Sequence, residues 1–322
     1  MISAKKTFLW AVLAATIAAA QPTTISPQDY VSRMSVGIDV GWASFQKSIN
    51  AYSAREPADF RAAGFDHVRI RTGRPATPDF LDYLERVVRD SLAVGLTPVL
   101  AYGPNLNRDP SPAAVERAVA WWRAVADRFA DYPPQLSFDL FIEPGKQMND
   151  HLNVLRDYYR RALATVRQTN PTRVVFLAPR RAAHPEFLPE LDDLFAADGY
   201  LAAETHFYAA GPSKKRERRL WTTGTAAEKA LIERQIGYAV EWRERTGVPV
   251  WIGAWMPGNY NKGNDYTPAE QVVFARFMAC RLRAARLPYA VNADQKFYDI
   301  NRKTWIPEMW PVVREVTNPR CP

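Results

Sequence analysis

The sequence contains only two cysteines, Cys280 and Cys321, among its 322 residues. Two thiols with no zinc-ligand cluster around them give no support to a metal centre. The chain also lacks a serine nucleophile elbow, a phosphate-binding loop and the Gly-x-Gly-x-x-Gly signature of dinucleotide-binding sheets. It has no internal repeat, low-complexity tract or nucleic-acid motif. We therefore expect no metal, no cofactor and no nucleic-acid partner.

The N-terminus has the composition of an export signal. Lys5 and Lys6 form a positive region, 8–20 is mostly apolar, and three alanines at 18–20 precede Gln21. The apolar stretch is shorter than the roughly 20 residues of a transmembrane helix, and no later segment suggests a membrane span. We predict a signal peptide over 1–20, a mature domain over 21–322, and a secreted or periplasmic location. A retained anchor is the alternative.

Export would place the two cysteines in an oxidising compartment, where disulfides form. A bridge between Cys280 and Cys321 would tie the C-terminal tail to a late helix. Two free thiols are the alternative.

Basic residues outnumber acidic ones. There are 42 against 34, which gives a formal net charge of +8, or +6 without the two lysines of the predicted signal. Such a surplus favours an anionic carbohydrate partner by general attraction. The densest basic run, 214–219, is expected in a solvated loop.

Past residue 21 the sequence alternates short apolar segments with longer amphipathic ones. The short segments lack strict alternation, which is typical of strands buried on both faces. Eight such units predict an α/β protein with one closed (β/α)₈ TIM barrel, and a doubly wound open sheet is the alternative. The expected strands are 36–41, 67–71, 97–102, 136–142, 173–178, 199–206, 249–254 and 288–292. The expected helices are 57–63, 78–95, 112–131, 150–169, 187–196, 226–247, 268–286 and 306–316.

A carboxylate closes the fourth of these strands. The run 136–144, Leu-Ser-Phe-Asp-Leu-Phe-Ile-Glu-Pro, ends on Glu143 and a proline. Reacting groups of a (β/α)₈ barrel sit at the C-terminal strand ends, so Glu143 is the first candidate for a catalytic acid. Other carboxylates at strand ends or in the following loops are Asp39, Glu204, Asp294 and Asp265.

Each of these carboxylates also has a structural interpretation. Asp39 could cap a loop or form an ion pair, and Asp294 could cap a turn. Glu204 lies two residues before His206, so both side chains share one strand face. It could be a deep charge paired with Arg69 or Arg71.

Five segments resemble glycoside hydrolase family 5, the cellulase-like retaining enzymes built on a (β/α)₈ barrel. They are 35–42, 63–71, 141–144 (Phe-Ile-Glu-Pro), 205–208 (Thr-His-Phe-Tyr) and 247–255. The resemblance implies that Glu143 is the acid/base and that Arg69 steadies the nucleophile. It also implies active-site roles for His206 and Tyr208.

Several positions depart from that family's pattern. Ala254 stands where the seventh strand carries the nucleophile, and Ile142 replaces the asparagine before the acid. The third strand ends without a histidine at 101–103, and 291–294 lacks the usual tryptophan. Retaining hydrolysis needs two carboxyl groups about 5–5.5 Å apart, so double displacement through an alanine is excluded. An inverting scheme needs an acid and a base roughly 6.5–9.5 Å apart, and the four carboxylates named above are candidates for the second group.

Aromatic and polar side chains near strand ends are candidates for binding a carbohydrate. Besides Arg69, they are Tyr102, His206, Tyr208, Trp255, Tyr260 and Asn292. Rings of this kind can stack on sugar faces. Each residue could instead anchor a loop or join an internal hydrogen-bond network.

We therefore predict an exported, monomeric barrel that hydrolyses or transfers O-glycosyl bonds of a polysaccharide or oligosaccharide. Glu143 would act as general acid beside a non-standard second carboxylate. Two alternatives stay open: an inactive carbohydrate-binding protein, and an engineered nucleophile-to-alanine variant of a retaining enzyme. The departures at several separate positions favour natural divergence over one engineered change.

Overall fold

The computed structural model describes residues 24–211, 213–215, 220–260 and 263–322. The predicted signal peptide 1–20 and most of the basic run 214–219 lie outside these residues. Among the described helices, none combines the length and apolarity that a membrane span requires.

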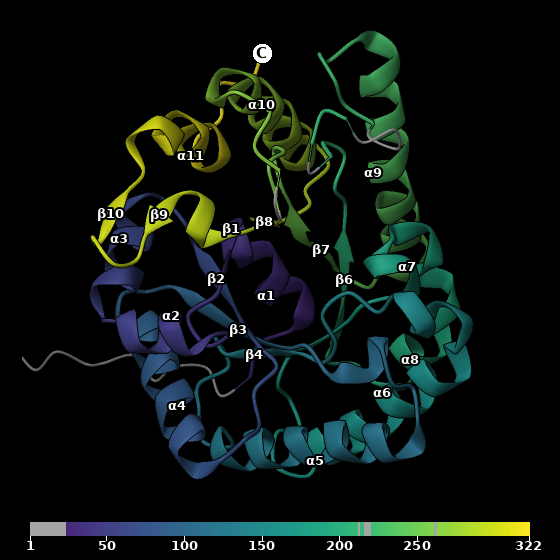
Figure 1. Ribbon diagram of the computed structural model, residues 1–322. Coiled ribbons are helices and arrows are strands. Elements are labelled where there is room, and N and C mark those ends of the chain that lie inside the picture. The colour runs from purple at the N-terminus through teal and green to yellow at the C-terminus, as the bar shows by residue number, and fades with distance from the viewer. Residues whose placement is uncertain (1–23, 212, 216–219, 261–262) are drawn as a thin grey trace, which may run out of the picture.

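Eight parallel strands close into one barrel in chain order, with β1 paired to β8 (Figure 1). This confirms the predicted (β/α)₈ fold and excludes the open sheet. The strands are β1 (Val36–Val40), β2 (His67–Thr72), β3 (Thr97–Tyr102), β4 (Ser137–Asp139), β5 (Val175–Leu177), β6 (Leu201–His206), β7 (Val250–Trp255) and β8 (Tyr289–Val291). A short antiparallel pair, β9 (Tyr298–Asp299) and β10 (Thr304–Trp305), follows β8.

Helices surround the barrel, and their starts and ends follow the expected local chemistry. Ser111 caps α5 and Thr267 caps α10, each directly before a proline in the first turn. Gly247 ends α9 at φ 72°, a left-handed conformation that suits glycine. The helices are α1 (Pro27–Met34), α2 (Gln46–Ala51), α3 (Arg55–Ala62), α4 (Pro78–Ala93), α5 (Pro112–Arg128), α6 (Leu152–Val166), α7 (Arg180–Ala183), α8 (Asp192–Ala197), α9 (Ala226–Thr246), α10 (Pro268–Ala284) and α11 (Trp310–Thr317).

Helix α1 was not predicted, and it closes the N-terminal end of the barrel. The Tyr30 hydroxyl donates to Ser137 Oγ at 2.8 Å, and its ring centroid lies 6.2 Å from that of Phe176. Tyr30, Met34 and Phe176 are all buried in the barrel's interior core. With this end closed, the opposite mouth is left for a functional site.

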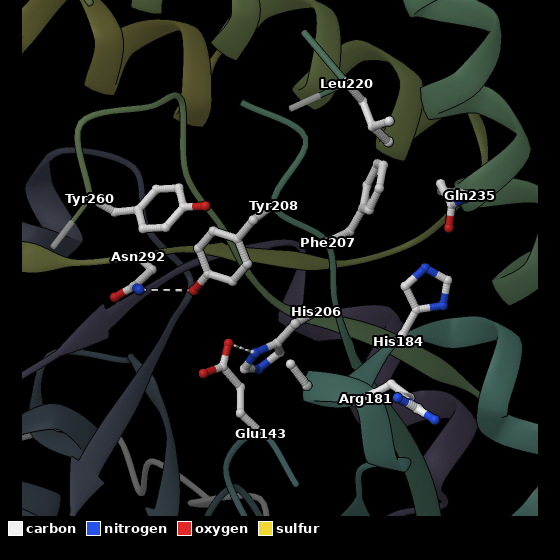
Figure 2. A pocket seen from close by; sticks show the side chains of 11 residues that line it. Glu143, Arg181, His184, His206, Phe207, Tyr208, Leu220, Gln235, Tyr260 and Asn292 are labelled. Atoms are coloured by element: carbon white, nitrogen blue, oxygen red, sulfur yellow. Dashed lines mark hydrogen bonds and ion pairs between the residues drawn. The ribbon is translucent and has the colours of Figure 1, made fainter. Parts of the chain in front are cut away.

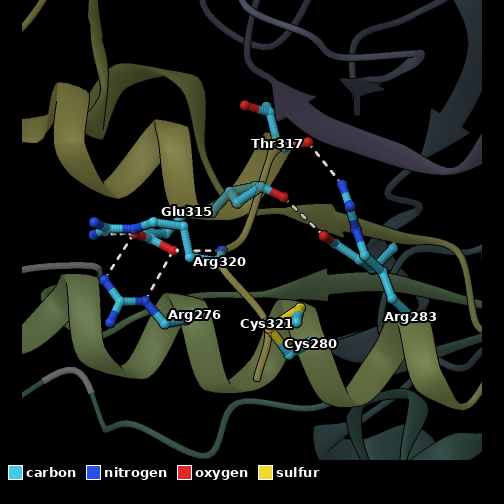
Figure 3. The surroundings of a disulfide bond; sticks show 9 residues. Arg276, Cys280, Arg283, Glu315, Thr317, Arg320 and Cys321 are labelled. Atoms are coloured by element: carbon cyan, nitrogen blue, oxygen red, sulfur yellow. Dashed lines mark hydrogen bonds and ion pairs between the residues drawn. A yellow bond between two sulfur atoms is a disulfide. The ribbon is translucent and has the colours of Figure 1, made fainter.

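Cys280 of α10 and Cys321 of the tail form a disulfide, which confirms that prediction (Figure 3). Beside it, Glu315 of α11 accepts hydrogen bonds from Arg276 at 2.8 Å and Arg320 at 2.7 Å. The bond and these ion pairs hold the C-terminal segment against α10.

The variant Cys321→Ser is expected to lower the free energy of unfolding by about 2–4 kcal/mol, because the bridge closes a long loop in the unfolded chain. The two cysteines are 41 residues apart. Denaturant unfolding with and without reductant measures the effect. Reductant should shift the wild type and leave Cys321→Ser unchanged, whereas an unshifted wild type would contradict the prediction.

Candidate functional site

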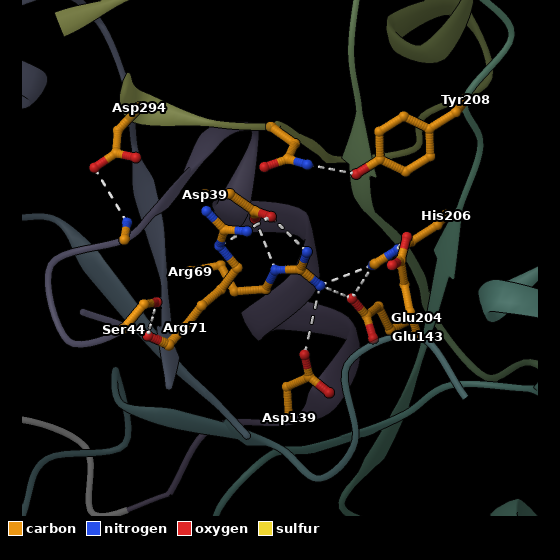
Figure 4. Close-up of polar contacts among 12 residues, drawn as sticks. Asp39, Ser44, Arg69, Arg71, Asp139, Glu143, Glu204, His206, Tyr208 and Asp294 are labelled. Carbon is orange, nitrogen blue, oxygen red and sulfur yellow. Dashed lines mark hydrogen bonds and ion pairs between the residues drawn. The ribbon is translucent and has the colours of Figure 1, made fainter. Parts of the chain in front are cut away.

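Arg69 of β2 lies at the centre of the barrel mouth, with only 1% of its side chain exposed (Figure 4). Its Nε and Nη2 donate to the two carboxylate oxygens of Asp39 at 2.7 and 2.5 Å. Its Nη1 pairs with Glu204 of β6 and lies 3.6 Å from Asp139 of β4. Burial opposes the charged form, but Asp39 and Glu204 raise the pKa of Arg69 well above its usual value. Arg69 therefore stays charged and joins β2 to β1, β4 and β6.

Glu204 is fully buried and lies against the backbone of β7 at Gly253. A side chain at position 253 would overlap Glu204 Oε1, so the glycine creates the space for this carboxylate. The next residue is Ala254, which is also fully buried. Glu204 thus brings a negative charge next to Arg69 and close to Ala254, the position at which the family's pattern has a nucleophile.

Asp139 is a buried carboxylate that the sequence reasoning did not single out. It has no exposed surface, and neither of its side-chain oxygens has a hydrogen-bond partner in the described chain. Burial and the nearby Glu204 raise its pKa well above the usual range. A charged residue inside the apolar run 136–142 was the signal that could have identified it.

Glu143 follows β4 in a left-handed conformation, with φ 53°. Asn107 fixes this bend, because its Nδ2 donates to the Glu143 carbonyl at 2.8 Å and its Oδ1 accepts from Gly145 N at 2.6 Å. The Glu143 side chain is 40% exposed, and its Oε1 lies 2.8 Å from His206 Nδ1. Burial opposes ionisation, but His206 and the nearby arginines outweigh it and lower the pKa of Glu143. Glu143 is therefore a carboxylate at neutral pH.

His206 ends β6 and lies between two carboxylates. Its Nδ1 faces Glu143 at 2.8 Å and its Nε2 faces Glu204 at 2.6 Å. Burial would lower its pKa, but Glu204 and Glu143 raise the pKa to about 9. The ring is therefore an imidazolium that donates to both carboxylates at neutral pH.

This ion pairing predicts a loss of stability at alkaline pH. The folded-state pKa of His206 is about 9, above the ordinary value of about 6.5. Its contribution is thus complete below about pH 6.5 and disappears as the pH rises through about 9, by up to about 3 kcal/mol. Unfolding free energies measured from pH 6 to 10 should show this decline.

The variant His206→Asn should flatten the decline, and the change at exposed His151, His151→Asn, should preserve it. An unaltered profile in His206→Asn would contradict a charged histidine.

A cavity of about 550 Å³ opens above these residues (Figure 2). Its described lining is Glu143, Arg181, Ala182, His184, His206, Phe207, Tyr208, Leu220, Gln235, Tyr260 and Asn292. Asn292 Nδ2 donates to the Tyr208 hydroxyl at 2.8 Å, and the Tyr260 ring centroid lies 5.0 Å from that of Tyr208. The structure thus brings four predicted sugar-binding residues around Glu143, and their binding roles stay predictions.

Six of the predicted site residues are not among the described residues that line this cavity, namely Asp39, Arg69, Tyr102, Glu204, Trp255 and Asp294. Trp255 is fully buried against Phe274 and Tyr289, so it offers no ring face to a sugar, which corrects its proposed stacking role. Tyr102 stacks on Trp121 with centroids 3.9 Å apart and lines a separate pocket. Asp39 is fully buried in its ion pair with Arg69, as its structural interpretation expected.

Asp265 and Asp294 have different environments. Asp265 is tied to the neighbouring loop, where it accepts from Ser213 Oγ at 2.7 Å and Lys214 N at 2.9 Å. Asp294 is 7% exposed, and its Oδ2 accepts from Gly41 N at 3.1 Å while Oδ1 has no partner in the described chain. Burial outweighs the nearby Arg71 and raises the pKa of Asp294 to about 6.

The far wall of the cavity is a left-handed turn that was not predicted. Arg181, Ala182 and Ala183 have φ of 61°, 60° and 59°. Ala182 N donates to the Pro144 carbonyl at 2.8 Å, which joins this wall to the loop that carries Glu143. Left-handed residues other than glycine cost roughly 1–2 kcal/mol each, and such strain often occurs at functional sites.

Known proteins share this architecture. Endoglucanase H from Acetivibrio thermocellus is 25% identical over 310 residues, covering 89% of this chain and 33% of the relative. The chain thus spans about a third of that relative's length. A hyperthermophilic endo-beta-1,4-glucanase solved with substrate aligns at TM-score 0.76 and 21% identity, covering 91% of this chain and 99% of the other. Cel5A from Thermotoga maritima, solved with mannotriose, aligns at TM-score 0.75 and 20% identity. The alignment covers 89% of this chain and 99% of the other.

The family match covers the whole barrel. The model named "Cellulase (glycosyl hydrolase family 5)" matches residues 36–292, from the first strand to the end of the eighth. This range includes Arg69, Glu143, His206 and Ala254 at the mouth. The chain therefore belongs to glycosyl hydrolase family 5.

Proposed function

We propose that this protein is a glycoside hydrolase that cleaves a polysaccharide or oligosaccharide, with Glu143 acting on the scissile bond. The observation that carries the proposal is the position of Glu143, the one carboxylate among the described residues lining the cavity. The similar proteins described as an endoglucanase and an endo-beta-1,4-glucanase support a β-linked glucan as the first substrate to test. The N-terminal composition supports export as part of the same proposal.

The chemistry we propose is a single displacement. Ala254 has no carboxylate with which to form a covalent intermediate, so one carboxyl group must activate water while another protonates the leaving oxygen. Glu143 is ionised, which suits the base better than the acid role that the sequence suggested. Asp294 is a predicted catalytic carboxyl group whose pKa burial raises to about 6, so it can keep a proton in mildly acidic solution. Environments that push two pKa values apart are typical of acid and base partners.

Asp294 is not among the described residues that line the cavity, so this pairing requires it to be reached from the other side of the barrel mouth. Glu143 follows β4 and Asp294 follows β8, and these strands are on opposite sides of an eight-stranded barrel. In Figure 4 the two side chains lie on either side of the Arg69 cluster. Inverting pairs are wider apart than retaining pairs because a water molecule must fit between the base and the sugar.

The test is release of reducing ends from a panel of β-glucans, β-mannans and uronic-acid polymers between pH 4 and 8. Turnover should fall as the pH rises through about 6, because Asp294 loses its proton. The variant Asp294→Asn should lose activity at every pH. A fully active Asp294→Asn would remove Asp294 from the reaction.

A second candidate is a carbohydrate-binding protein without activity. It is favoured by the alanine at position 254, which cannot act as a nucleophile, and by the low exposure of Asp294. Binding of a panel glycan with no reducing ends at any pH would support this candidate over the hydrolase.

A further inference from the structure

The two ends of the cavity differ in charge. In Figure 2, Arg181 and His184 lie at one end, Asn292 and Tyr260 at the other, and Glu143 lies between them. Glu143 is paired with the His206 imidazolium, which Glu204 shares. Arg181 adds a positive charge at its own end of the cavity.

Arg181 has no carboxylate within ion-pairing distance in the described chain, and its guanidinium lies 5.9 Å from the Phe187 ring centroid. Its neighbour Arg180 differs, because Glu190 engages that guanidinium through two hydrogen bonds of 2.6 Å. Of these two adjacent arginines, Arg180 forms an ion pair with Glu190. Arg181, which lines the cavity, has no carboxylate partner in the described chain.

The backbone below Arg181 is fixed. Its N–H donates to Asn149 Oδ1 at 2.9 Å, and the next N–H donates to the Pro144 carbonyl at 2.8 Å. The left-handed turn therefore fixes the Arg181 backbone relative to the Glu143 loop, and the exposed side chain extends from it. Close by, Gln235 also lines the cavity, where its side chain is hydrogen-bonded with His184.

We propose that the glycan bound here carries a uronic acid, whose carboxylate is bound by Arg181 beside the sugar at Glu143. This rests on the proposed function and names its substrate class. A guanidinium forms two parallel hydrogen bonds with a carboxylate. A neutral glucan leaves Arg181 without an anionic partner.

The test compares three acidic oligosaccharides with their carboxyl-reduced forms: C6-oxidised cello-oligosaccharide, oligogalacturonate and oligomannuronate. Dissociation constants are measured by calorimetry in the full chain carrying Glu143→Gln, so that cleavage of the ligand is slow during the measurement. At least one acidic form is expected to bind about 10- to 100-fold more tightly than its reduced form. The preference should weaken in high salt.

Adding Arg181→Gln should remove the preference without changing affinity for the reduced form, and Arg181→Lys should keep part of it. The matched control is Arg302→Gln, which removes one charge from a side chain that is 82% exposed in the β9–β10 hairpin. Equal affinity for acidic and reduced forms, or a preference that survives Arg181→Gln, would overturn the inference alone. Binding of none of the six ligands, nor of the neutral panel glycans, would overturn the proposed function and the inference with it.

Discussion

The variant Glu143→Gln is expected to turn over substrate about 100- to 10,000-fold more slowly than the wild type, the range for loss of a general acid or base. Glutamine has the same shape and can still accept the His206 Nδ1–H hydrogen bond, which spans 2.8 Å in the wild type. It cannot take a proton from water. Affinity for the glycan should therefore change little while kcat falls, as initial rates and equilibrium binding on one substrate will show.

The matched control for this variant is Asp265→Asn. Asp265 is a carboxylate in the loop after β7, but its hydrogen bonds go to Ser213 and Lys214 and it does not line the cavity. Its variant should stay within about twofold of the wild-type rate, because no reacting group is lost. If the two variants were equally active, Glu143 would have no part in the chemistry.

The variant Arg69→Met is expected to lower the free energy of unfolding by about 3–5 kcal/mol, because removing one partner leaves buried charges without compensation. Asp39 and Glu204 both have no exposed surface, and both pair with this one guanidinium. Denaturant unfolding measures the loss. The curve should show lower stability with an unchanged slope, as for a protein that still folds cooperatively.

An exposed ion pair provides the control for Arg69. Arg55 is 63% exposed and pairs with Asp59 at 3.3 Å, so Arg55→Met should cost no more than about 1 kcal/mol. A loss in Arg69→Met as small as this would mean that water reaches Asp39 and Glu204.

Sequence patterns predicted the barrel well because the signals are local. Apolar runs buried on both faces marked the strands, and cap residues such as Ser111 and Thr267 marked helix starts. Glu143 and Asn292 were identified because strand ends meet at one mouth of the barrel, and His206 was identified through the family resemblance of its Thr-His-Phe-Tyr motif. The position along the chain was enough to place them together.

The features that were missed depend on contacts between distant segments. Nothing local shows that Glu204 needs Gly253 of the next strand to be free of a side chain. Nothing local shows that Trp255 packs against Phe274 of α10, because β7 has an irregular register with β8 between Ile252 and Trp255. The left-handed turn at Arg181 contains no glycine, and its conformation depends on hydrogen bonds to the β4 loop.

Protonation states were also beyond sequence reasoning. Glu143 looked like an acid from its strand end alone, but an acid must hold its proton near the working pH. His206 and the arginines lower its pKa, whereas burial raises that of Asp294. Only the three-dimensional arrangement shows which charges surround each carboxyl group.

The most direct test of the pairing between Glu143 and Asp294 is the anomeric configuration of the first product. Proton NMR during the early turnover of a cleaved panel substrate reads this configuration before mutarotation mixes the anomers. We predict inversion, because Ala254 cannot carry a covalent intermediate and a single displacement remains. A first product that retains the configuration of the substrate would contradict the account.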